Sequence, residues 1–332
     1  MPVRILNQTE VTALLPMAEC IDVMDGALRN LSSGGALLPL RTVLRLPDGK
    51  GFFGVMPASL AQPAALGLKA IAVFPGNEGT ELDSHQGLVI LFDPECGRPV
   101  AVLDASSITA IRTAAVSGVA TRALARPDAG DLALLGSGVQ ARTHLEAMAV
   151  VRRLRRVRAW SPNAGRLGAF ARWAADRFGI VVEPVRSSRD AVTGADLVCA
   201  VSASPTPVVR GEWLTEGAHV NAVGSSLPTT RELDTAAILR GRLLVDRRES
   251  ALNEAGDFLI PRSEGAIGDD HIVGELGDVL LGRIAGRNGA SDVTVFKSLG
   301  LAVEDLAAAH HVLRRAEERG VGIVAELGGR RS

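Results

Sequence analysis

The chain has 332 residues, of which 47% are hydrophobic and 22% charged, and its formal net charge is −1. This composition is typical of a globular protein of about two domains, each large enough to have its own core. The charge balance gives no electrostatic reason to expect a nucleic-acid partner. The apolar runs are shorter than a membrane span, and the first residues lack the apolar core of a signal peptide. We therefore expect a cytoplasmic protein that binds neither nucleic acid nor membranes.

Two residue types narrow the chemistry further. The three cysteines, Cys20, Cys96 and Cys199, are odd in number and far apart, so they predict neither a disulfide framework nor a zinc site. Tyrosine is absent, which excludes any oxidoreductase mechanism that needs a tyrosine as general acid.

The first part of the chain changes from helical to strand-like spacing of its apolar residues. Apolar residues at helical spacing predict a helix over residues 16–31, with Pro16 in its first turn. Turn signals such as Pro47-Asp-Gly49 separate the runs that follow. These runs predict strands over residues 40–46, 51–56, 66–74, 87–92 and 100–104. We expect an antiparallel or mixed sheet with a core of its own.

Helices and strands alternate in the second part of the chain. A helix rich in small residues is predicted over residues 106–125, and a last helix over 302–320 is expected to return to the first domain. Between them, strands are predicted over residues 132–135, 157–160, 196–202, 219–224, 242–246 and 293–296, with helices over 164–178 and 229–240. This alternation predicts an α/β fold with a doubly wound parallel sheet of the Rossmann type.

A glycine-rich turn joins the first strand of this sheet to its helix. Residues 132–135 form a short apolar run, Gly136 and Gly138 follow it, and helical spacing begins at Gln140. Gly136 permits the tight turn, Gly138 lets the backbone approach a pyrophosphate, and Ala141 lets the helix pack closely. The first N–H groups of the helix would face the phosphates. We therefore predict a dinucleotide site rather than an ordinary turn between strand and helix.

The end of the next strand indicates which nicotinamide cofactor binds. An Asp or Glu at this position accepts hydrogen bonds from the ribose 2′-OH and repels a 2′-phosphate. Here the segment is Arg158-Ala-Trp-Ser-Pro-Asn163, with Ser161 where the acid would stand. Donors from Ser161 and Asn163, with Arg166 nearby, favour NADP(H).

Four cations lie where their charge needs an explanation. Arg41 and Arg45 share one face of a predicted strand, and the pattern leaves open whether that face is solvated or binds an anion. Lys69 lies in a run that is apolar on both faces, where an ammonium is costly unless it pairs with a carboxylate or takes part in chemistry. Arg112 lies near the start of an apolar helix, where a cation opposes the helix dipole. Its alternative explanation is an ion pair between the domains.

The histidines and the acidic loop give weaker indications. His85 opens a strand after a loop, where a lone histidine is usually structural. Asp269, Asp270, His271 and Glu275 resemble metal ligands only superficially, because their spacing matches no ligand pattern. We expect a solvated loop or an interface there, and no metal.

Several segments, considered together, are specific to one family. They are Arg41-Thr-Val43, Gly54-Val-Met-Pro-Ala58, Ser84-His-Gln86, Leu91-Phe-Asp-Pro94, Ile108-Thr-Ala-Ile-Arg-Thr-Ala-Ala115, Gly136-Ser-Gly-Val-Gln-Ala141, Asn221-Ala-Val-Gly224, Glu275-Leu-Gly-Asp278 and Val295-Phe-Lys-Ser-Leu-Gly300. On these segments the chain resembles the ornithine cyclodeaminase/mu-crystallin family over nearly its whole length. The resemblance implies a homodimer whose N-terminal sheets join across the subunit interface. We place a substrate-binding and dimerisation domain at residues 1–115 with 303–332, and the Rossmann domain at 116–302.

The same resemblance implies a substrate carboxylate held by Arg41, Lys69 and Arg112, whereas Arg45 has no counterpart in the family pattern. The family includes cyclodeaminases, alanine and other amino-acid dehydrogenases, and reductases of cyclic ketimines, so the fold leaves the reaction open. Cyclodeaminases and the related alanine dehydrogenases carry an Asp within a Gly-x-Asp-x-Pro segment and an acid at the cofactor ribose. Here Ser226 and Ser161 occupy these positions, as in the mu-crystallin-like ketimine reductases.

We therefore expect a reductase of Δ1-pyrroline-2-carboxylate and Δ1-piperideine-2-carboxylate, yielding L-proline and L-pipecolate, that prefers NADPH over NADH. The alternatives are ornithine cyclodeaminase, alanine or another amino-acid dehydrogenase, and an NADPH-dependent binding protein for a small molecule. Each takes an amino-acid, imino-acid or other small carboxylated ligand.

Lys69 and Arg112 are the predicted catalytic residues, and His85 and Ser226 join the substrate site. Lys69 is the first candidate for the proton donor, because desolvation and neighbouring arginines would lower its pKa. His85 is the second candidate and bound water the third. The cofactor site is predicted to comprise Thr113, Gly136, Ser137, Gly138, Val139, Gln140, Ser161, Asn163, Arg166, Val201, Gly224, Ser226, Lys297 and Gly300.

Overall fold

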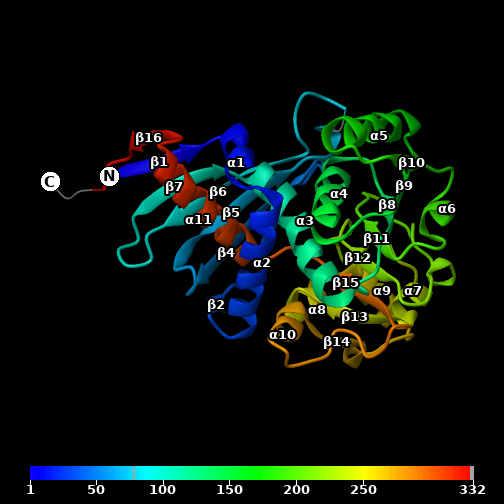
Figure 1. Cartoon of the computed structure of the whole chain (residues 1–332). Coiled ribbons are helices and arrows are strands. Elements are labelled where there is room, and N and C mark those ends of the chain that lie inside the picture. Colours follow the sequence, from blue (N-terminus) through cyan, green and yellow to red (C-terminus); the bar gives the residue numbers. More distant parts are fainter. Residues whose placement is uncertain (78, 330–332) are drawn as a thin grey trace. The chain divides into compact units, whose positions relative to one another are not determined.

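The computed structural model describes residues 1–77 and 79–329, which fall into two compact units (Figure 1). Unit 1 consists of Met1–Arg112 with Leu301–Ser332, and unit 2 consists of Thr113–Gly300. The first boundary falls inside helix α3 (Ala105–Leu124), three residues before the predicted one. Among the described residues, no helix is both long enough and apolar enough to cross a membrane.

Unit 1 is built on a mixed sheet. Its strands are β1 (Pro2–Leu6), β2 (Ala36–Leu37), β3 (Thr42–Arg45), β4 (Phe52–Leu60), β5 (Ala65–Val73), β6 (His85–Phe92), β7 (Pro99–Asp104) and β16 (Ile323–Glu326). They lie in the order β16-β1-β7-β6-β5-β4-β2, with β3 also paired to β4. Strands β1 and β7 are parallel, and the other pairs are antiparallel. The predicted mixed sheet is therefore confirmed.

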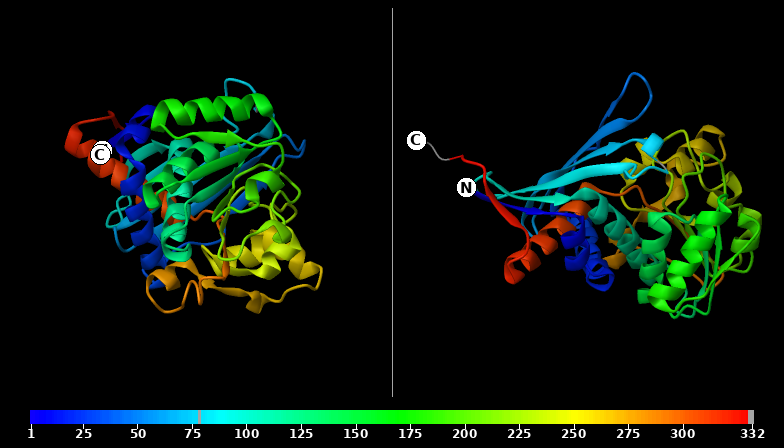
Figure 2. Two further views of the ribbon diagram at one scale, coloured as in Figure 1. Left: turned by 45° about the vertical axis from the view of Figure 1, so that its right-hand side comes forward. Right: turned by 90° about the horizontal axis from the view of Figure 1, so that it is seen from above.

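One face of this sheet is covered by helices. The helices of unit 1, besides the start of α3, are α1 (Gln8–Leu14), α2 (Met17–Ser32) and α11 (Ala302–Arg319). Helix α11 packs against β4, β5, β6 and α2, and Figure 2 shows α2 and α11 on the same side of the sheet. Residues of β5 alternate between buried and more exposed positions, as expected for a strand with one covered face. The positions that face α11 include Lys69.

Unit 2 has a sheet in which every strand is parallel to its neighbours. Its strands are β8 (Asp131–Leu135), β9 (Arg156–Trp160), β10 (Val182–Pro184), β11 (Leu197–Ala200), β12 (His219–Ala222), β13 (Gly241–Val245), β14 (Ile272–Glu275) and β15 (Val293–Lys297). They lie in the order β10-β9-β8-β11-β12-β15-β13-β14. This confirms the predicted Rossmann-type sheet. The strand order reverses between β8 and β11, which is where such sheets place their ligands.

The helices of unit 2 include three that the sequence predicts, α4, α5 and α7, of which α7 begins later than expected. They are α4 (Val139–Val151), α5 (Ala164–Phe178), α6 (Ser188–Val192), α7 (Thr235–Arg240), α8 (Arg248–Glu254), α9 (Gly256–Ser263) and α10 (Leu276–Leu280). Helix α5 has the predicted bounds. Helix α7 was expected from residue 229 but begins at Thr235, because Asp234 caps it by accepting a hydrogen bond from the Ala237 N–H. The residues before it pair elsewhere, since the N–H groups of Glu232 and Leu233 both donate to Asp257.

Candidate functional site

Lys69 is buried on the covered face of the unit 1 sheet. Its side chain is 3% exposed, and its Nζ lies 2.7 Å from Oδ2 of Asp305, whose side chain is fully buried in α11. Strand β5 aims Lys69 at α11 because it stands between Met56 and Val89 in the register of three neighbouring strands. The carboxylate partner that the apolar surroundings require is therefore Asp305.

Arg112 reaches the same carboxylate from α3. Its Nε donates to Oδ1 of Asp305 at 2.9 Å, and its Nη1 donates to Oε2 of Glu304 at 2.6 Å. Glu304 also accepts a hydrogen bond from the N–H of Leu301, so the start of α11 is tied to its own side chain. All these groups belong to unit 1, so the ion pair lies within one unit and not between domains. We refer to Lys69, Arg112, Glu304 and Asp305 as the buried ion cluster.

The surroundings of Lys69 lower its pKa to about 8. Desolvation is the largest cause, and the charges of Arg112 and Arg41 act in the same direction. The negative charge of Asp305 opposes them by favouring the ammonium. The desolvation and the neighbouring arginines are the two causes expected from the sequence. Lys69 thus has a pKa near neutrality, which suits a group that transfers protons.

The two arginines near β3 have different environments. Arg41 is half-buried just before the strand, and its charge acts on Lys69. Arg45, at the end of β3, is exposed, and its guanidinium carbon lies 5.9 Å from the centre of the Phe52 ring. Of the two, Arg41 is therefore the one that lies near the buried ion cluster.

His85 begins β6, and its exposed ring lies beside the Ser84 hydroxyl, with 3.1 Å between Nδ1 and Oγ. Partial desolvation and the charge of Lys69 lower its pKa, and Asp83 acts in the opposite direction. Its backbone carbonyl accepts a hydrogen bond from Ser106. His85 is thus electrostatically coupled to Lys69 without belonging to the buried ion cluster.

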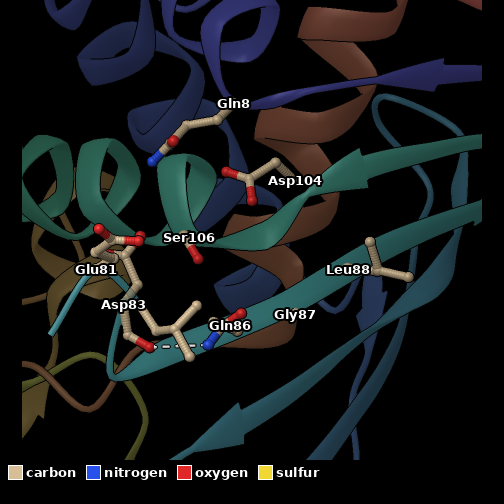
Figure 3. A pocket seen from close by; sticks show the side chains of 9 residues that line it. Gln8, Glu81, Asp83, Gln86, Gly87, Leu88, Asp104 and Ser106 are labelled. Atoms are coloured by element: carbon tan, nitrogen blue, oxygen red, sulfur yellow. Dashed lines mark hydrogen bonds between the residues drawn. The ribbon is translucent and has the colours of Figure 1, made fainter. Parts of the chain in front are cut away.

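Unit 1 has an open cavity of about 440 Å³, and Figure 3 shows the side chains that line it. It is lined by Gln8, Glu81, Leu82, Asp83, Gln86, Gly87, Leu88, Asp104 and Ser106. Its polar lining is acidic or neutral, and none of the three cations predicted to hold a carboxylate lines it. The cavity is therefore not the predicted substrate site.

The glycine turn of unit 2 has the geometry of a dinucleotide loop. Gly136 has φ +136°, and a Cβ there would lie 2.7 Å from the carbonyl oxygen of Val201. Gly138 is the N-cap of α4 and has no side chain to cap the helix, and a Cβ placed on it would meet nothing within 4 Å. The N–H groups of the first turn thus border open space, which is where a pyrophosphate binds in such folds. Ala141 is fully buried, as close packing of the helix requires.

The end of β9 presents hydroxyl groups. Ser161 follows the strand, and its Oγ accepts a hydrogen bond from Ser137 Oγ at 3.0 Å. Asn163 caps α5 by accepting a hydrogen bond from the N–H of Arg166. The glycine turn and the segment after β9 are therefore joined through two serine side chains. Neither contributes a carboxylate at the position that distinguishes the two nicotinamide cofactors.

The other residues predicted to bind the cofactor share one place in unit 2, apart from Thr113 in α3. They lie at the first turn of α4 or beyond the carboxyl ends of parallel strands: Val139, Gln140, Val201, Gly224, Ser226 and Gly300. The N–H of Gly300 donates to the buried side chain of Asp246. This edge is where open α/β sheets bind their ligands.

Lys297 lies at the same edge, but its ammonium points into the protein. It is 1% exposed, lies 2.9 Å from Oδ2 of Asp257, and donates a hydrogen bond to the carbonyl of Ser225 at 2.5 Å. The side chain of Lys297, which was predicted to bind the cofactor, therefore holds the loop that carries Ser226.

Sequence reasoning missed Glu232, which completes this arrangement. Its buried carboxylate accepts hydrogen bonds from the N–H and hydroxyl of Ser202 and from the N–H of Gly224. Desolvation raises the pKa of Glu232 to about 7, aided by Asp257 and opposed by the Ser202 hydrogen bonds and Lys297. We refer to Glu232, Asp257 and Lys297 as the loop anchor. Glu232 lies in a stretch that the sequence predicted to be helical, so nothing in the pattern of that stretch indicated that its side chain would hold the loop.

The acidic loop near residue 270 does not form a metal centre. His271 Nε2 lies 2.8 Å from the carbonyl of Ile238, and Glu275 accepts a hydrogen bond from the N–H of Arg248. Within residues 1–77 and 79–329, no group of three or more His, Cys, Asp or Glu side chains could hold a metal ion.

Comparison with known proteins places these features in a family. The model of the ornithine cyclodeaminase/mu-crystallin family matches residues 2–320. The ketimine reductase mu-crystallin of Mus musculus is 42% identical over 296 residues, which cover 87% of this chain and 89% of that protein.

Two solved structures are similar along nearly the whole chain. The Δ1-pyrroline-2-carboxylate reductase of Thermococcus litoralis, in complex with NADH and L-proline, is 37% identical with a TM-score of 0.94, covering 97% of this chain and 99% of that one. An archaeal alanine dehydrogenase dimer with bound NAD is 33% identical with a TM-score of 0.93, covering 99% and 100%.

Proposed function

Because the chain belongs to the ornithine cyclodeaminase/mu-crystallin family, we propose that it reduces cyclic ketimino acids with a nicotinamide cofactor. Its substrates are Δ1-pyrroline-2-carboxylate and Δ1-piperideine-2-carboxylate, which become L-proline and L-pipecolate. The observation that carries this proposal is the buried pair of Lys69 and Arg112, in a chain that also has an open glycine turn for a dinucleotide. The similarity to reductases of such substrates supports it.

The substrate carboxylate binds to Arg41, Lys69 and Arg112. An ammonium has three N–H donors and a guanidinium five, so both can contact a substrate as well as the acids of the buried ion cluster. Charge-assisted hydrogen bonds of this kind fix the orientation of the ring, and positioning supplies a large share of catalysis. His85, whose pKa responds to Lys69, adds a polar side chain near these cations.

Bound NAD(P)H supplies the hydride, which forms a C–H bond at C2 as the C=N double bond becomes single. The ring nitrogen must gain a proton in the same reaction. Lys69 is the residue that we assign to this transfer, because its pKa of about 8 leaves it mostly protonated at neutral pH yet able to give up the proton. The resulting neutral amine regains a proton from water.

The cofactor preference is for NADPH over NADH. Ser161 and Ser137 offer hydroxyl groups where a carboxylate would repel a 2′-phosphate, and Arg166 follows on the next helix. Because the two solved structures described above hold NADH and NAD, this preference is a property to be measured on this chain.

We also propose that the chain forms a homodimer through the uncovered face of the unit 1 sheet. Phe53, Leu66 and Leu88 lie on this face and are 41%, 37% and 47% exposed. Exposed apolar side chains gathered on one sheet face are typical of protein interfaces. One similar structure is a dimer.

The test follows absorbance at 340 nm with NADPH or NADH and each cyclic imine. Pyruvate with ammonia, and L-ornithine with NAD⁺, are assayed in parallel for their own products. Rapid NADPH oxidation with the cyclic imines alone is the expected result. Proline and ammonia from ornithine would show instead that Ser226 permits cyclodeamination, and alanine formation would identify a dehydrogenase. Tight NADPH binding without turnover would leave the binding protein as the function.

A further inference from the structure

Asp305 divides its carboxylate between the two buried cations. One oxygen, Oδ2, lies 2.7 Å from Lys69 Nζ, and the other, Oδ1, accepts the hydrogen bond from Arg112 Nε at 2.9 Å. Asp305 is fully buried, and the side chains of Lys69 and Arg112 are 3% and 4% exposed. The distance between the two cations is therefore set by the width of one carboxylate.

The neighbouring Glu304 has a different set of partners. Its Oε2 accepts hydrogen bonds from Arg112 Nη1 at 2.6 Å and from the N–H of Leu301 at 3.1 Å. Glu304 thus holds Arg112 and the first turn of α11, whereas Asp305 holds Arg112 and Lys69. The two adjacent acids can be compared directly, because both contact Arg112, while the second partner is the ammonium of Lys69 for Asp305 and the backbone N–H of Leu301 for Glu304.

The charged groups that face Lys69 come from several elements. Asp305 on α11 favours the ammonium, whereas Arg112 on α3 and Arg41 before β3 disfavour it. His85 on β6 also responds to the charge of Lys69. Asp305 is therefore the acid that opposes both desolvation and two like charges around this amine.

We propose that Asp305 is a positioning residue that keeps Lys69 protonated and orients its ammonium, so that Lys69 can deliver the proton to the ring nitrogen. This inference rests on the proposed function. In the step, hydride from NAD(P)H forms the C2–H bond, the C=N π electrons become the nitrogen lone pair, and that lone pair takes a proton from the ammonium of Lys69. Asp305 stays a carboxylate throughout, and the neutral amine of Lys69 regains its proton from water.

A purely structural role for Asp305 makes a different prediction. If Asp305 only stabilised unit 1, its loss would lower the melting temperature, and the pH at which kcat/KM falls would not follow the titration of Lys69. If it keeps Lys69 protonated for catalysis, an Asp305→Asn substitution must lower the pKa of Lys69 and move the fall of kcat/KM with it. An opposite charge at this distance typically changes a pKa by about one to three units.

The pKa of Lys69 can be measured directly, because the chain has three lysines, Lys50, Lys69 and Lys297. NMR of protein labelled with ¹³C at lysine Cε would give one signal for each, and a Lys69→Arg variant assigns the signal of Lys69. We expect Lys69 to titrate at least about one pH unit lower in Asp305→Asn than in the wild type. In Glu304→Gln its titration stays close to that of the wild type.

Kinetics then connect this titration to turnover. At high pH, kcat/KM for the cyclic imine falls as Lys69 loses its proton, and this fall moves to lower pH in Asp305→Asn. The substrate is the same for every variant, so its own titration cannot cause the shift. Asp305→Glu keeps the negative charge, so kcat/KM should fall at the same pH as in the wild type. Its longer side chain changes the orientation of Lys69, so kcat should remain lower than in the wild type.

Three results would overturn the inference. They are a Lys69 titration that is unchanged in Asp305→Asn, an equal shift in Glu304→Gln, and a fall of kcat/KM that stays at its wild-type pH in Asp305→Asn. If Asp305→Asn does not fold, Asp305→Ser replaces it, since the smaller side chain leaves room for water beside the ammonium. The NMR titration does not depend on turnover, so an inactive wild-type protein would refute the proposed function while leaving the effect of Asp305 on Lys69 measurable.

Discussion

At the scale of single residues, the chemistry depends on cations that the fold places in apolar surroundings. An ammonium and a guanidinium inside a protein are stable only when carboxylates accompany them. Lys69 and Arg112 have Glu304 and Asp305, all at most 4% exposed at their side chains. This burial keeps water from weakening their interaction with an anion, and it lowers the pKa of Lys69 into the range useful for catalysis.

Arg112→Ala should lower kcat/KM by several orders of magnitude, because it removes a carboxylate contact and leaves two buried acids with less positive charge. The steady-state assay with the cyclic imines measures this loss. Arg45→Ala is the matched control, since the exposed Arg45 contacts the Phe52 ring and should change kcat/KM by less than about twofold. Near-full activity of Arg112→Ala would refute its assignment to the substrate carboxylate.

Ser161→Asp should reverse the cofactor preference. A carboxylate at the end of β9 repels the 2′-phosphate of NADPH and accepts hydrogen bonds from the ribose of NADH. We expect the ratio of kcat/KM for NADPH to that for NADH to fall by at least about tenfold, an effect of about 1.4 kcal/mol. Ser161→Ala, which removes only the hydroxyl, should change the ratio less. An unchanged ratio in Ser161→Asp would show that another residue sets the preference.

At the scale of elements, close backbone contacts and the loop anchor fix the loops at the carboxyl ends of the unit 2 strands. A Cβ at Gly224 would lie 2.0 Å from the carbonyl oxygen of Ser202, and a Cβ at Gly256 would lie 2.0 Å from that of Thr230. These glycines let the loops after β11 and β12 lie close to their neighbours. Glu232, Asp257 and Lys297 then fix the loops from inside through backbone groups of Gly224 and Ser225.

Two glycines at this edge should respond differently to alanine. Gly138→Ala should leave the melting temperature unchanged and weaken NADPH binding, because its Cβ meets no protein atom but would enter the space of the pyrophosphate. Gly224→Ala should lower the melting temperature by several degrees, because its Cβ clashes with backbone. Thermal melts and cofactor titrations check both. Unchanged NADPH affinity in Gly138→Ala would contradict the dinucleotide site.

Two buried histidines should make unit 2 sensitive to acid. Desolvation lowers the pKa of His144 to about 4 and that of His219 to about 3, both below the ordinary value of about 6.5. Their contribution to stability is therefore complete above about pH 6.5 and is lost as pH falls through about 4 for His144 and about 3 for His219, because the unfolded chain binds more protons over this range. The melting temperature should fall over this range, and less steeply in His144→Gln. An equal slope in that variant would contradict the account.

The sequence predicted the elements of both sheets better than their contacts. Helix α5 has the predicted bounds, because Asn163 and Gly179 give clear signals for its start and end. Short elements such as α1 and β16 were missed, since few residues carry their pattern. The acids of the buried ion cluster were also missed, because Asp305 is 193 positions from Arg112 and only the fold brings them together.

At the scale of the whole molecule, the proposed dimer gives a function to the open face of the unit 1 sheet. Leu88→Asp places a charge among the apolar side chains of that face and should yield a monomer in light scattering coupled to size exclusion. Leu239→Asp is the matched control, because Leu239 is similarly exposed, at 51%, but belongs to unit 2. A wild-type monomer, or a dimer that survives Leu88→Asp, would refute the interface.

The proposed reaction needs both the cations, which belong to unit 1, and the cofactor, whose glycine turn belongs to unit 2. The most direct test is the stoichiometry of a single incubation with Δ1-pyrroline-2-carboxylate and NADPH. The account predicts one L-proline formed for each NADPH oxidised, with no ammonia consumed or released. NADPH oxidation without L-proline, or L-proline formed only from ornithine with release of ammonia, would contradict it.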